Sequence, residues 1–284
     1  MSQLITTILP TRNNGNTLRA AIDSILNQTH SDLELIVVDD YSDDETQEIV
    51  AEYVRSDSRV RYTLADFDDP KRLYRGKDCN AGYSARNTGL KLAKGDWITF
   101  QDGDDLSLLN RLEVQLMLVE EYKVSHLSTG CFWLEEDKHI GRSLNWQHYL
   151  QTIQPNLMNT NDILELALNQ KGLLHNLPDA IYRLVPFRVK QSRFTQGLFY
   201  PPHNHQLPYP NAANNPFFKA NLVKSVRFNP LSIRRFPSMK GRGADKDFNF
   251  RLALDCQSSA SIDIPLYGWR TPTPFTSYVN DFLL

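Results

Sequence analysis

The sequence predicts an α/β fold with a mostly parallel sheet that is covered by helices on both faces. Within residues 1–110, short runs of apolar and β-branched residues alternate with segments of helical periodicity. These runs are apolar throughout, which is typical of strands buried on both faces of a parallel sheet. Polar residues directly follow three of the runs, and ligands of such sheets bind beyond the carboxyl ends of the strands. The sequence therefore predicts a binding site at one edge of the sheet.

Turn and capping residues mark the switches between strand and helix in this region. The first run, Leu4–Leu9, ends at Pro10, and turn residues separate it from a helix over Thr17–Gln28. Ser42 or Asp43 is suited to cap the next helix. The remaining elements expected here are strands at Leu33–Val38, Val60–Leu64 and Trp97–Phe100 and a helix over Ala81–Leu92.

Residues 111–284 have a less regular pattern. The predicted elements are a helix over residues 106–123, a strand at residues 127–134, a helix over Asp245–Leu254 and a strand at Ile262–Tyr267. Residues 155–212 are rich in Pro, Asn and Gln, and five of the 15 prolines lie between residues 186 and 210. We interpret this segment as loops and short elements that cover the site.

The composition excludes several classes of protein. A formal net charge of −2 and a pI of about 6.4 give no positive excess for nucleic-acid binding. Three cysteines without close spacing exclude a disulfide framework and a zinc cluster. No stretch approaches the roughly 18 apolar residues of a membrane span, and no signal peptide is evident. We therefore expect a cytoplasmic protein without a transmembrane segment, for which peripheral contact with the inner membrane stays open.

Two acidic clusters stand at predicted strand ends. Three ionised carboxylates in Asp102-Gly103-Asp104-Asp105 repel one another unless a cation offsets their charge. Carboxylate oxygens suit Mg²⁺ or Mn²⁺, and a solvated acidic turn is the alternative. Asp39-Asp40 could bond a base or a sugar hydroxyl, or could serve as a turn or helix cap.

Five motifs in order carry a family resemblance. They are Ile-Leu-Pro-Thr-Arg-Asn at 8–13, Ser-Ile-Leu-Asn-Gln-Thr at 24–29, Glu-Leu-Ile-Val-Val-Asp-Asp at 34–40, Ser-Ala-Arg-Asn-Thr-Gly at 84–89 and Ala-Lys-Gly-Asp-Trp-Ile-Thr-Phe-Gln-Asp-Gly-Asp-Asp at 93–105. Together they resemble the family 2 glycosyltransferases of the GT-A fold. The resemblance implies one continuous catalytic domain, with a nucleotide-sugar-binding half at 1–110 and an acceptor-binding half with a C-terminal extension at 111–284.

The resemblance also implies roles for individual residues on the donor side. The nucleotide pocket would be lined by Pro10, Thr11 and Asn13, with Asp40 on the base and Asp39 in support. Asp102-Gly103-Asp104 would be the DXD motif. Asp104 would bind Mn²⁺ or Mg²⁺ directly, Asp102 would meet the ribose or the metal's water shell, and Asp105 could assist. Arg86 would lie near the carboxylates and the diphosphate, although a surface arginine paired with an acid is the simpler alternative.

A candidate catalytic base lies in the second half. Gly-Ala-Asp-Lys-Asp-Phe at 243–248 resembles the family's Glu-Asp motif, with Asp245 as the base and Ala244 in place of the usual glutamate. Asp247 is a second candidate, and both acids could simply favour the helix dipole. The implied reaction is a single displacement at the anomeric carbon that inverts its configuration. Metal would offset charge on the leaving diphosphate, and a carboxylate would accept the proton of the acceptor hydroxyl.

Other residues give weaker indications of function, and alternative functions stay open. Arg234, Arg235, Lys240 and Arg242 favour a solvated basic face over contact with a diphosphate. Trp133, Tyr267 and Trp269 favour core packing over stacking on sugar rings. The expected donor is a UDP-sugar, and the expected acceptor is a glycan or lipid-linked acceptor of bacterial surface polysaccharide synthesis. The alternatives are a catalytically inactive relative that binds a nucleotide-sugar or a glycan, a sugar-nucleotide nucleotidyltransferase and a phospho-acceptor signalling domain.

Overall fold

The structure is a computed structural model that describes residues 3–69, 73–74, 77–78, 82–169, 173–174, 176–190, 194–199, 216–235, 243–271 and 278–284. Its strands are β1 (Ile5–Thr11), β2 (Leu33–Asp39), β3 (Val60–Leu64), β4 (Leu73–Tyr74), β5 (Lys77–Asp78), β6 (Trp97–Phe100), β7 (Leu106–Ser107), β8 (His126–Trp133), β9 (Leu157–Met158), β10 (Pro216–Lys219) and β11 (Ser259–Trp269). Its main helices are α1 (Gly15–Leu26), α2 (Thr46–Ser56), α3 (Tyr83–Leu92), α4 (Arg111–Glu121), α6 (Trp146–Ile153), α7 (Thr160–Asn169) and α11 (Ala244–Cys256). Shorter helical turns are α5 (Glu136–His139), α8 (Asp179–Tyr182), α9 (Phe187–Lys190), α10 (Gln196–Phe199), η1 (Ala220–Lys224), η2 (Leu231–Ile233) and η3 (Val279–Phe282).

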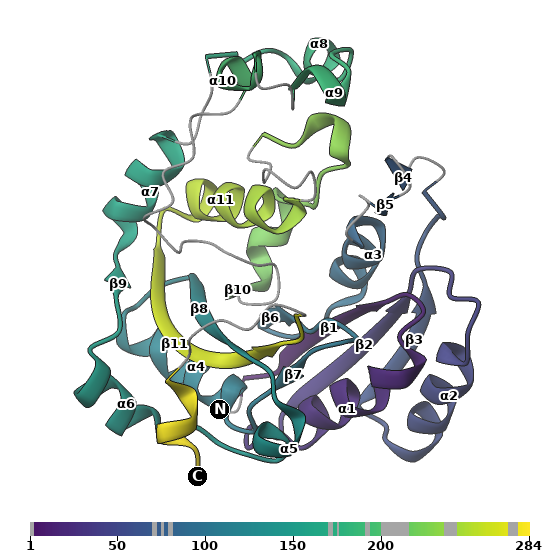
Figure 1. Ribbon diagram of the computed structural model, residues 1–284, viewed down its shortest axis with the longest axis vertical. Coiled ribbons are helices and arrows are strands. Elements are labelled where there is room, and N and C mark those ends of the chain that lie inside the picture. Colours follow the sequence, from purple (N-terminus) through teal and green to yellow (C-terminus); the bar gives the residue numbers. More distant parts are fainter. Residues whose placement is uncertain are drawn as a thin grey trace.

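One large sheet runs through the chain in the order β3-β2-β1-β6-β10-β8-β11-β7 (Figure 1). The four strands β1, β2, β3 and β6 are parallel to one another, as the sequence predicts. β10 is antiparallel to both β6 and β8, whereas β11 and β8 are parallel. The register pairs Thr11 with Asp39 and Ile8 with Phe100, so the polar residues after these strands emerge at one edge.

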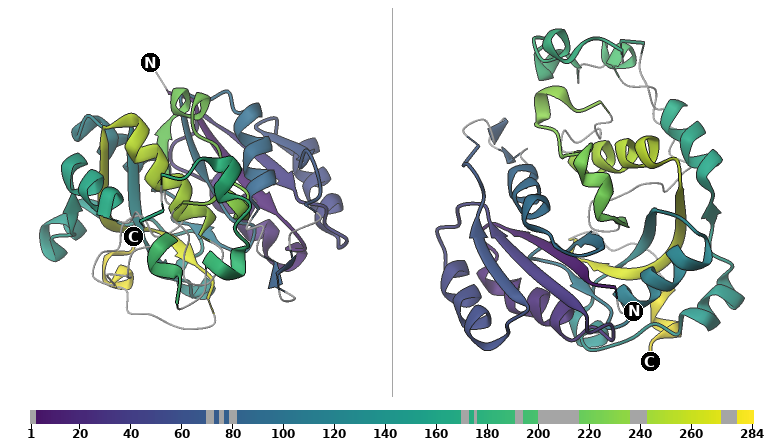
Figure 2. Two further views of the ribbon diagram at one scale, coloured as in Figure 1. Left: turned by 90° about the horizontal axis from the view of Figure 1, so that it is seen from above. Right: turned by 180° about the vertical axis from the view of Figure 1, so that it is seen from behind.

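Helices cover both faces of the sheet and create two apolar cores. In β2, Leu35 and Val37 belong to one core, while Ile36 and Val38 belong to the other, as the alternation of strand side chains requires. Helices α1, α2 and α4 contribute to the first core. Helices α3 and α11 contribute to the second and lie on the same face of the sheet (Figures 1 and 2). The predicted α/β architecture is therefore present.

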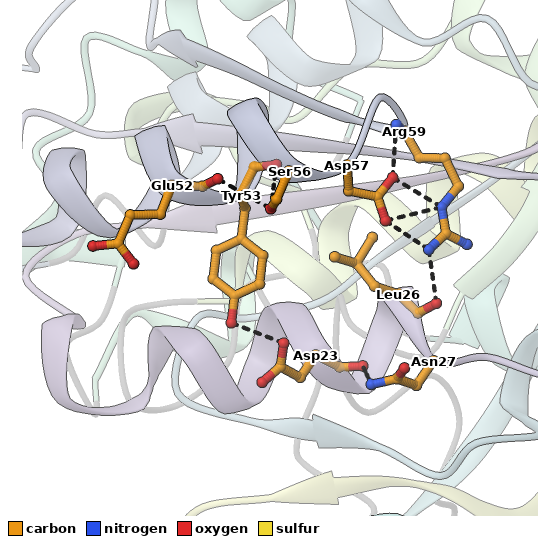
Figure 3. Close-up of polar contacts among 8 residues, drawn as sticks. All are labelled: Asp23, Leu26, Asn27, Glu52, Tyr53, Ser56, Asp57 and Arg59. Atoms are coloured by element: carbon orange, nitrogen blue, oxygen red, sulfur yellow. Dashed lines mark hydrogen bonds and ion pairs between the residues drawn. The ribbon is translucent and has the colours of Figure 1, made fainter.

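The outer helices α1 and α2 are joined by polar contacts (Figure 3). The Tyr53 hydroxyl donates to Asp23 at 2.8 Å, and burial, followed by this bond, raises the pKa of Tyr53 to about 12. Arg59 pairs with Asp57 at 2.7 Å and also donates to the Leu26 carbonyl at 3.0 Å. The drawn residues do not line the cavity described below, so we assign these contacts a structural role.

Three local expectations are corrected. Helix α2 begins at Thr46 after Glu45, so neither Ser42 nor Asp43 caps it; the Ser42 hydroxyl instead donates to Asp39 at 2.6 Å. The helix expected over 106–123 begins at Arg111, because Leu106–Ser107 pairs with β11. Residues 155–212, expected as loops and short elements, contain short elements such as β9 and α8 but also the longer, ten-residue helix α7, and parts of that segment lie outside the described residues.

The central strand β10 was not predicted. It has only four residues, begins with a proline and carries Phe217 and Phe218, which are both fully buried. Its place between β6 and β8 depends on tertiary pairing, for which a four-residue run gives no periodic signal.

Among the described residues, no helix combines the length and apolar character that a membrane span requires.

Asn87 joins α3 to the segment that leads to α11. Its side-chain amide donates to the Phe228 carbonyl at 2.9 Å and accepts from the Phe228 amide at 2.8 Å. We expect Asn87→Ala to lower the free energy of unfolding by about 2 kcal/mol, because two backbone groups lose their partner. The melting temperature should then fall by about 4–6 °C. In the matched control Asn27→Ala, one exposed bond to the Asp23 carbonyl is lost, and a shift as large as that of Asn87→Ala would contradict the assignment.

Candidate active site

A cavity of about 460 Å³ opens beyond the carboxyl ends of β1, β2 and β6. Its walls come from the loops after these strands, from the start of α3 and from the first turn of α11. The lining residues are Pro10, Thr11, Arg12, Asn13, Asn14, Asp40, Gly82, Arg86, Asp102, Gly103, Asp104 and Asp245. Residues more than 200 positions apart in the chain therefore share one cavity.

Most of the site residues predicted from the sequence line this cavity. Those that do so are Pro10, Thr11, Asn13, Asp40, Arg86, Asp102, Gly103, Asp104 and Asp245. Asp39, Asp105 and Asp247 are buried and lie outside the lining. The geometry divides the predicted set into residues that a ligand can touch and residues that hold other parts of the site.

The turn after β6 brings three carboxylates together. One oxygen from each of Asp102, Asp104 and Asp105 lies within 4.8 Å of the others, and Asp104 is the exposed member. Opposite oxygens around an octahedral Mg²⁺ are roughly 4 Å apart, and hard oxygen donors are what Mg²⁺ or Mn²⁺ prefers. The chemistry and spacing of these residues therefore fit a divalent cation.

Burial and the crowding of negative charge both raise pKa values in this cluster. The pKa of Asp105 is raised to about 8, first by burial and then by the charges of Asp102 and Asp104. Partial desolvation, followed by the charge of Asp102, also raises the pKa of Asp104. A cation among the three would favour the ionised forms and reverse both shifts.

Gly103 is required by close packing. A Cβ at this position would approach the side-chain oxygens of Asn14 and Thr11 to 2.9 Å each. The Gly103 carbonyl also accepts from the Thr17 hydroxyl at 2.8 Å. Its φ lies outside the left-handed region, so the glycine permits close approach of two loops and does not provide an unusual turn.

Arg86 provides positive charge inside the cavity. Its guanidinium donates to Asp102 at 2.6 Å and lies 5.6 Å from the centre of the Phe228 ring, while only 5% of the residue is exposed. Phe228 in turn stacks on Phe248 of α11 with ring centres 4.0 Å apart. A rigid aromatic support therefore holds this charge beside the acidic turn, and Arg86 is not a surface arginine.

Helix α11 places Asp245 in the lining of the same cavity. The helix begins after Gly243, whose left-handed φ of 58° turns the chain into the first turn. Asp245 is half-buried and interacts electrostatically with Arg86 and Arg234. Ala244 is fully buried in the second core, so the residue in place of the family's glutamate packs beneath the site.

Asp247 and Asp39 are engaged in structural contacts. Asp247 is fully buried and accepts from Asn229 at 3.2 Å and from the Arg251 side chain at 2.9 Å. Asp39 accepts from the Ser42 amide and hydroxyl and from the Tyr62 hydroxyl at 3.0 Å. These contacts favour Asp245 over Asp247 as the acid that meets a ligand.

Several residues around the cavity were missed or misjudged at the level of sequence. Arg12 and Asn14 line it, and the Asn14 side chain accepts from Thr11 and from the Arg12 amide. Arg234 is only 1% exposed, so it does not belong to a solvated basic face. The basic residues Lys240 and Arg242 lie outside the described part of the chain.

Comparisons with curated proteins agree with these motifs. The chain is 35% identical over 139 residues to the Escherichia coli UDP-Glc:alpha-D-GlcNAc-diphosphoundecaprenol beta-1,3-glucosyltransferase WfgD. The aligned region covers 49% of this chain and 50% of that protein. The chain is also 30% identical over 175 residues to an uncharacterized glycosyltransferase of Rickettsia bellii, with an aligned region that covers 60% of this chain and 24% of that protein. The chain thus spans half or less of the length of these relatives.

Solved structures share the fold. S. aureus TarS 1-349 in complex with UDP has a TM-score of 0.56 at 16% identity, over 94% of this chain and 60% of that one. Its complex with UDP-GlcNAc has a TM-score of 0.54 over 98% of this chain. The GT-A fold predicted from the sequence is thereby confirmed. Residues 6–190, more than half of the chain, match the profile described as Glycosyl transferase family 2, so the chain belongs to that family.

Proposed function

We propose that this chain is a metal-dependent glycosyltransferase that moves a sugar from a UDP-sugar to an acceptor hydroxyl with inversion at the anomeric carbon. The observation that carries the proposal is the convergence of Asp104, Arg86 and Asp245 on one cavity. A nucleotide-sugar needs a cation near its diphosphate, and its acceptor needs a base on the other side of the sugar. The acidic turn after β6 and the first turn of α11 supply candidates for both.

The metal site of the proposal is formed by Asp104 and Asp102. A bound Mn²⁺ or Mg²⁺ would stabilise negative charge on the departing diphosphate. Asp104 is the exposed carboxylate of the cluster and would bind the ion directly. Asp102 already accepts from Arg86, so it would act through the water shell or the ribose. Arg86 would bring a second positive charge toward the same phosphates.

Asp245 is the proposed catalytic base. The acceptor hydroxyl must lose a proton as its oxygen attacks the anomeric carbon, and one carboxylate oxygen can accept it. Arg86 and Arg234 interact with Asp245 and would help to keep it ionised. A single displacement from the face opposite the diphosphate inverts the configuration of the sugar. Apart from proton acceptance by Asp245, residues of the chain bind and orient the reactants.

The nucleoside part would occupy the wall formed by the loops after β1 and β2. Pro10, Thr11 and Asn13 would contact it, with Asp40 on the base. Asp39 would act in support, since it holds the loop through Ser42. WfgD is named for a UDP-Glc donor, and the TarS complexes contain UDP or UDP-GlcNAc, which supports UDP as the nucleotide here.

The acceptor is proposed to be a glycan or a lipid-linked sugar of bacterial surface polysaccharide synthesis. The WfgD name describes an acceptor on diphosphoundecaprenol, which supports the lipid-linked form. Leu173 and Leu184, before and after α8, are 83% and 77% exposed, and exposed apolar side chains such as these suit contact with a lipid-bearing acceptor. We place the reaction in the cytoplasm with peripheral contact at the inner membrane.

Stereochemistry of the product tests the proposal. The chain would be incubated with UDP-α-glucose, UDP-α-N-acetylglucosamine and Mn²⁺, with and without a GlcNAc-diphosphate lipid. We expect UDP release that depends on metal, together with a β-linked sugar in the proton NMR spectrum of the product made with the lipid acceptor. An α-linked product would contradict the single displacement, and release that survives EDTA would contradict the metal requirement.

A further inference from the structure

Tyr267 connects the far end of β11 to the acidic turn. Its side chain is 1% exposed, and its hydroxyl donates to Asp105 at 2.8 Å. The same oxygen accepts from the Asp102 amide at 3.1 Å and from the Gln101 side chain at 3.4 Å. One buried hydroxyl therefore fixes both the first and the last acidic residue of the turn.

The residue after β11 completes the contact. The Arg270 amide donates to the second Asp105 oxygen at 2.7 Å, and its side-chain Nε donates to the Asp104 carbonyl at 2.7 Å. Both oxygens of Asp105 are thus held by β11 and its extension. The backbone of Asp102 and Asp104 is held by the same two residues, while the Asp104 carboxylate is left exposed toward the cavity.

Arg111 packs its guanidinium against the Tyr267 ring. Its guanidinium lies 5.0 Å from the centre of the Tyr267 ring and is fully buried. It donates to Ser107 at 2.9 Å and to Thr99 at 2.7 Å, which lie on β7 and β6. Stacking on a planar cation restricts the ring and thereby the position of the hydroxyl.

We propose that Tyr267 is a positioning residue that presets the turn of Asp102 and Asp104 for a divalent cation. The proposal rests on the metal site assigned above. Tyr267 does not line the cavity, so it would act through Asp105 and the backbone of Asp102. Partners behind metal ligands commonly change metal affinity by about 10–100-fold, because they fix ligand orientation. The acceptor half would in this way control metal binding in the donor half.

Mn²⁺ affinity of the full chain tests this role. Free Mn²⁺ would be followed by electron paramagnetic resonance during titration of the wild-type chain, Tyr267→Phe and Tyr149→Phe. Tyr149 is a matched control, since its buried hydroxyl also bonds β11, through the Asp263 carbonyl at 2.9 Å. We expect Tyr267→Phe to weaken Mn²⁺ binding by about 10–100-fold and Tyr149→Phe to leave it within about twofold. Tyr267→Phe should also lose more in melting temperature, because its hydroxyl makes three hydrogen bonds and that of Tyr149 makes one to the Asp263 carbonyl.

The outcomes separate positioning from general stabilisation. Unchanged Mn²⁺ affinity in Tyr267→Phe, or equal losses in both variants, would overturn the positioning role and leave the proposed function standing. Absence of Mn²⁺ binding by the wild-type chain would overturn the metal assignment and the positioning role together. The double variant Tyr267→Phe with Asp105→Asn adds a second criterion. Its loss of Mn²⁺ affinity should be smaller than the sum of the two single losses, because both changes alter the same contact between Tyr267 and Asp105. Additive losses would overturn the positioning role.

Discussion

Asp245→Asn is expected to lower the rate of sugar transfer by about 10²–10⁴-fold while donor binding stays within about twofold. The substitution keeps the size and hydrogen-bonding capacity of the side chain and removes its ability to accept a proton. Asp245 belongs to α11, whereas Asp102 and Asp104 belong to the turn after β6, so an isosteric change at Asp245 should leave that turn in place. Steady-state kinetics of UDP release, combined with a UDP titration, measure the two quantities separately.

Asp247→Asn is the matched control for that prediction. Asp247 is in the same helical turn but is fully buried and paired with Arg251 at 2.8 Å. Breaking a buried ion pair on one side costs about 3 kcal/mol, so this variant should lose stability first. Near-normal turnover in Asp245→Asn, with a collapse of turnover in a folded Asp247→Asn, would transfer the role of base to Asp247.

Asp104→Ala is expected to abolish the part of UDP affinity that depends on metal. Asp104 is the exposed carboxylate of the cluster, and Asp102 is already bonded to Arg86 at 2.6 Å. Without Asp104, a cation would have too few accessible ligands from this chain. Calorimetric titration of UDP with Mn²⁺ should show at least about a tenfold loss in affinity. In EDTA the variant and the wild-type chain should bind UDP equally weakly.

Asp43→Ala provides the control for charge alone. Asp43 is an exposed acid close to the cavity, and its backbone amide donates to the Asn13 side chain at 2.9 Å. Removing it changes the net charge by the same amount without removing a proposed ligand. If Asp104→Ala and Asp43→Ala weaken UDP binding to the same extent, direct ligation by Asp104 is ruled out.

The parallel part of the fold was predictable because the local sequence pattern is sufficient to identify its strands. Val60–Leu64 and Trp97–Phe100 are short runs rich in β-branched and aromatic residues, with the boundaries that the structure gives them. Their order and the helices between them determine a sheet edge, and the polar residues at strand ends meet there. Family motifs then pointed to the residues of that edge, and nine of the predicted site residues line one cavity.

The remaining features depend on tertiary contacts that no local pattern encodes. β10 is short and pairs with two strands that are distant in sequence. Tyr267 was interpreted as core packing, which is correct for its ring, but its hydroxyl reaches a turn more than 160 residues earlier. A buried aromatic with a polar tip usually finds a partner, yet the sequence does not reveal which one.

The measurement that tests the central claim most directly is a thermal-shift screen of nucleoside diphosphates with and without Mn²⁺. A ligand that binds the folded chain at 100 times its dissociation constant adds about 2.7 kcal/mol and raises the melting temperature. We expect a shift with UDP that requires Mn²⁺ and is lost in Asp104→Ala. Stabilisation by UDP that is the same in Mn²⁺ and EDTA, or no shift with any nucleoside diphosphate, would contradict a metal–diphosphate site at this edge of the sheet.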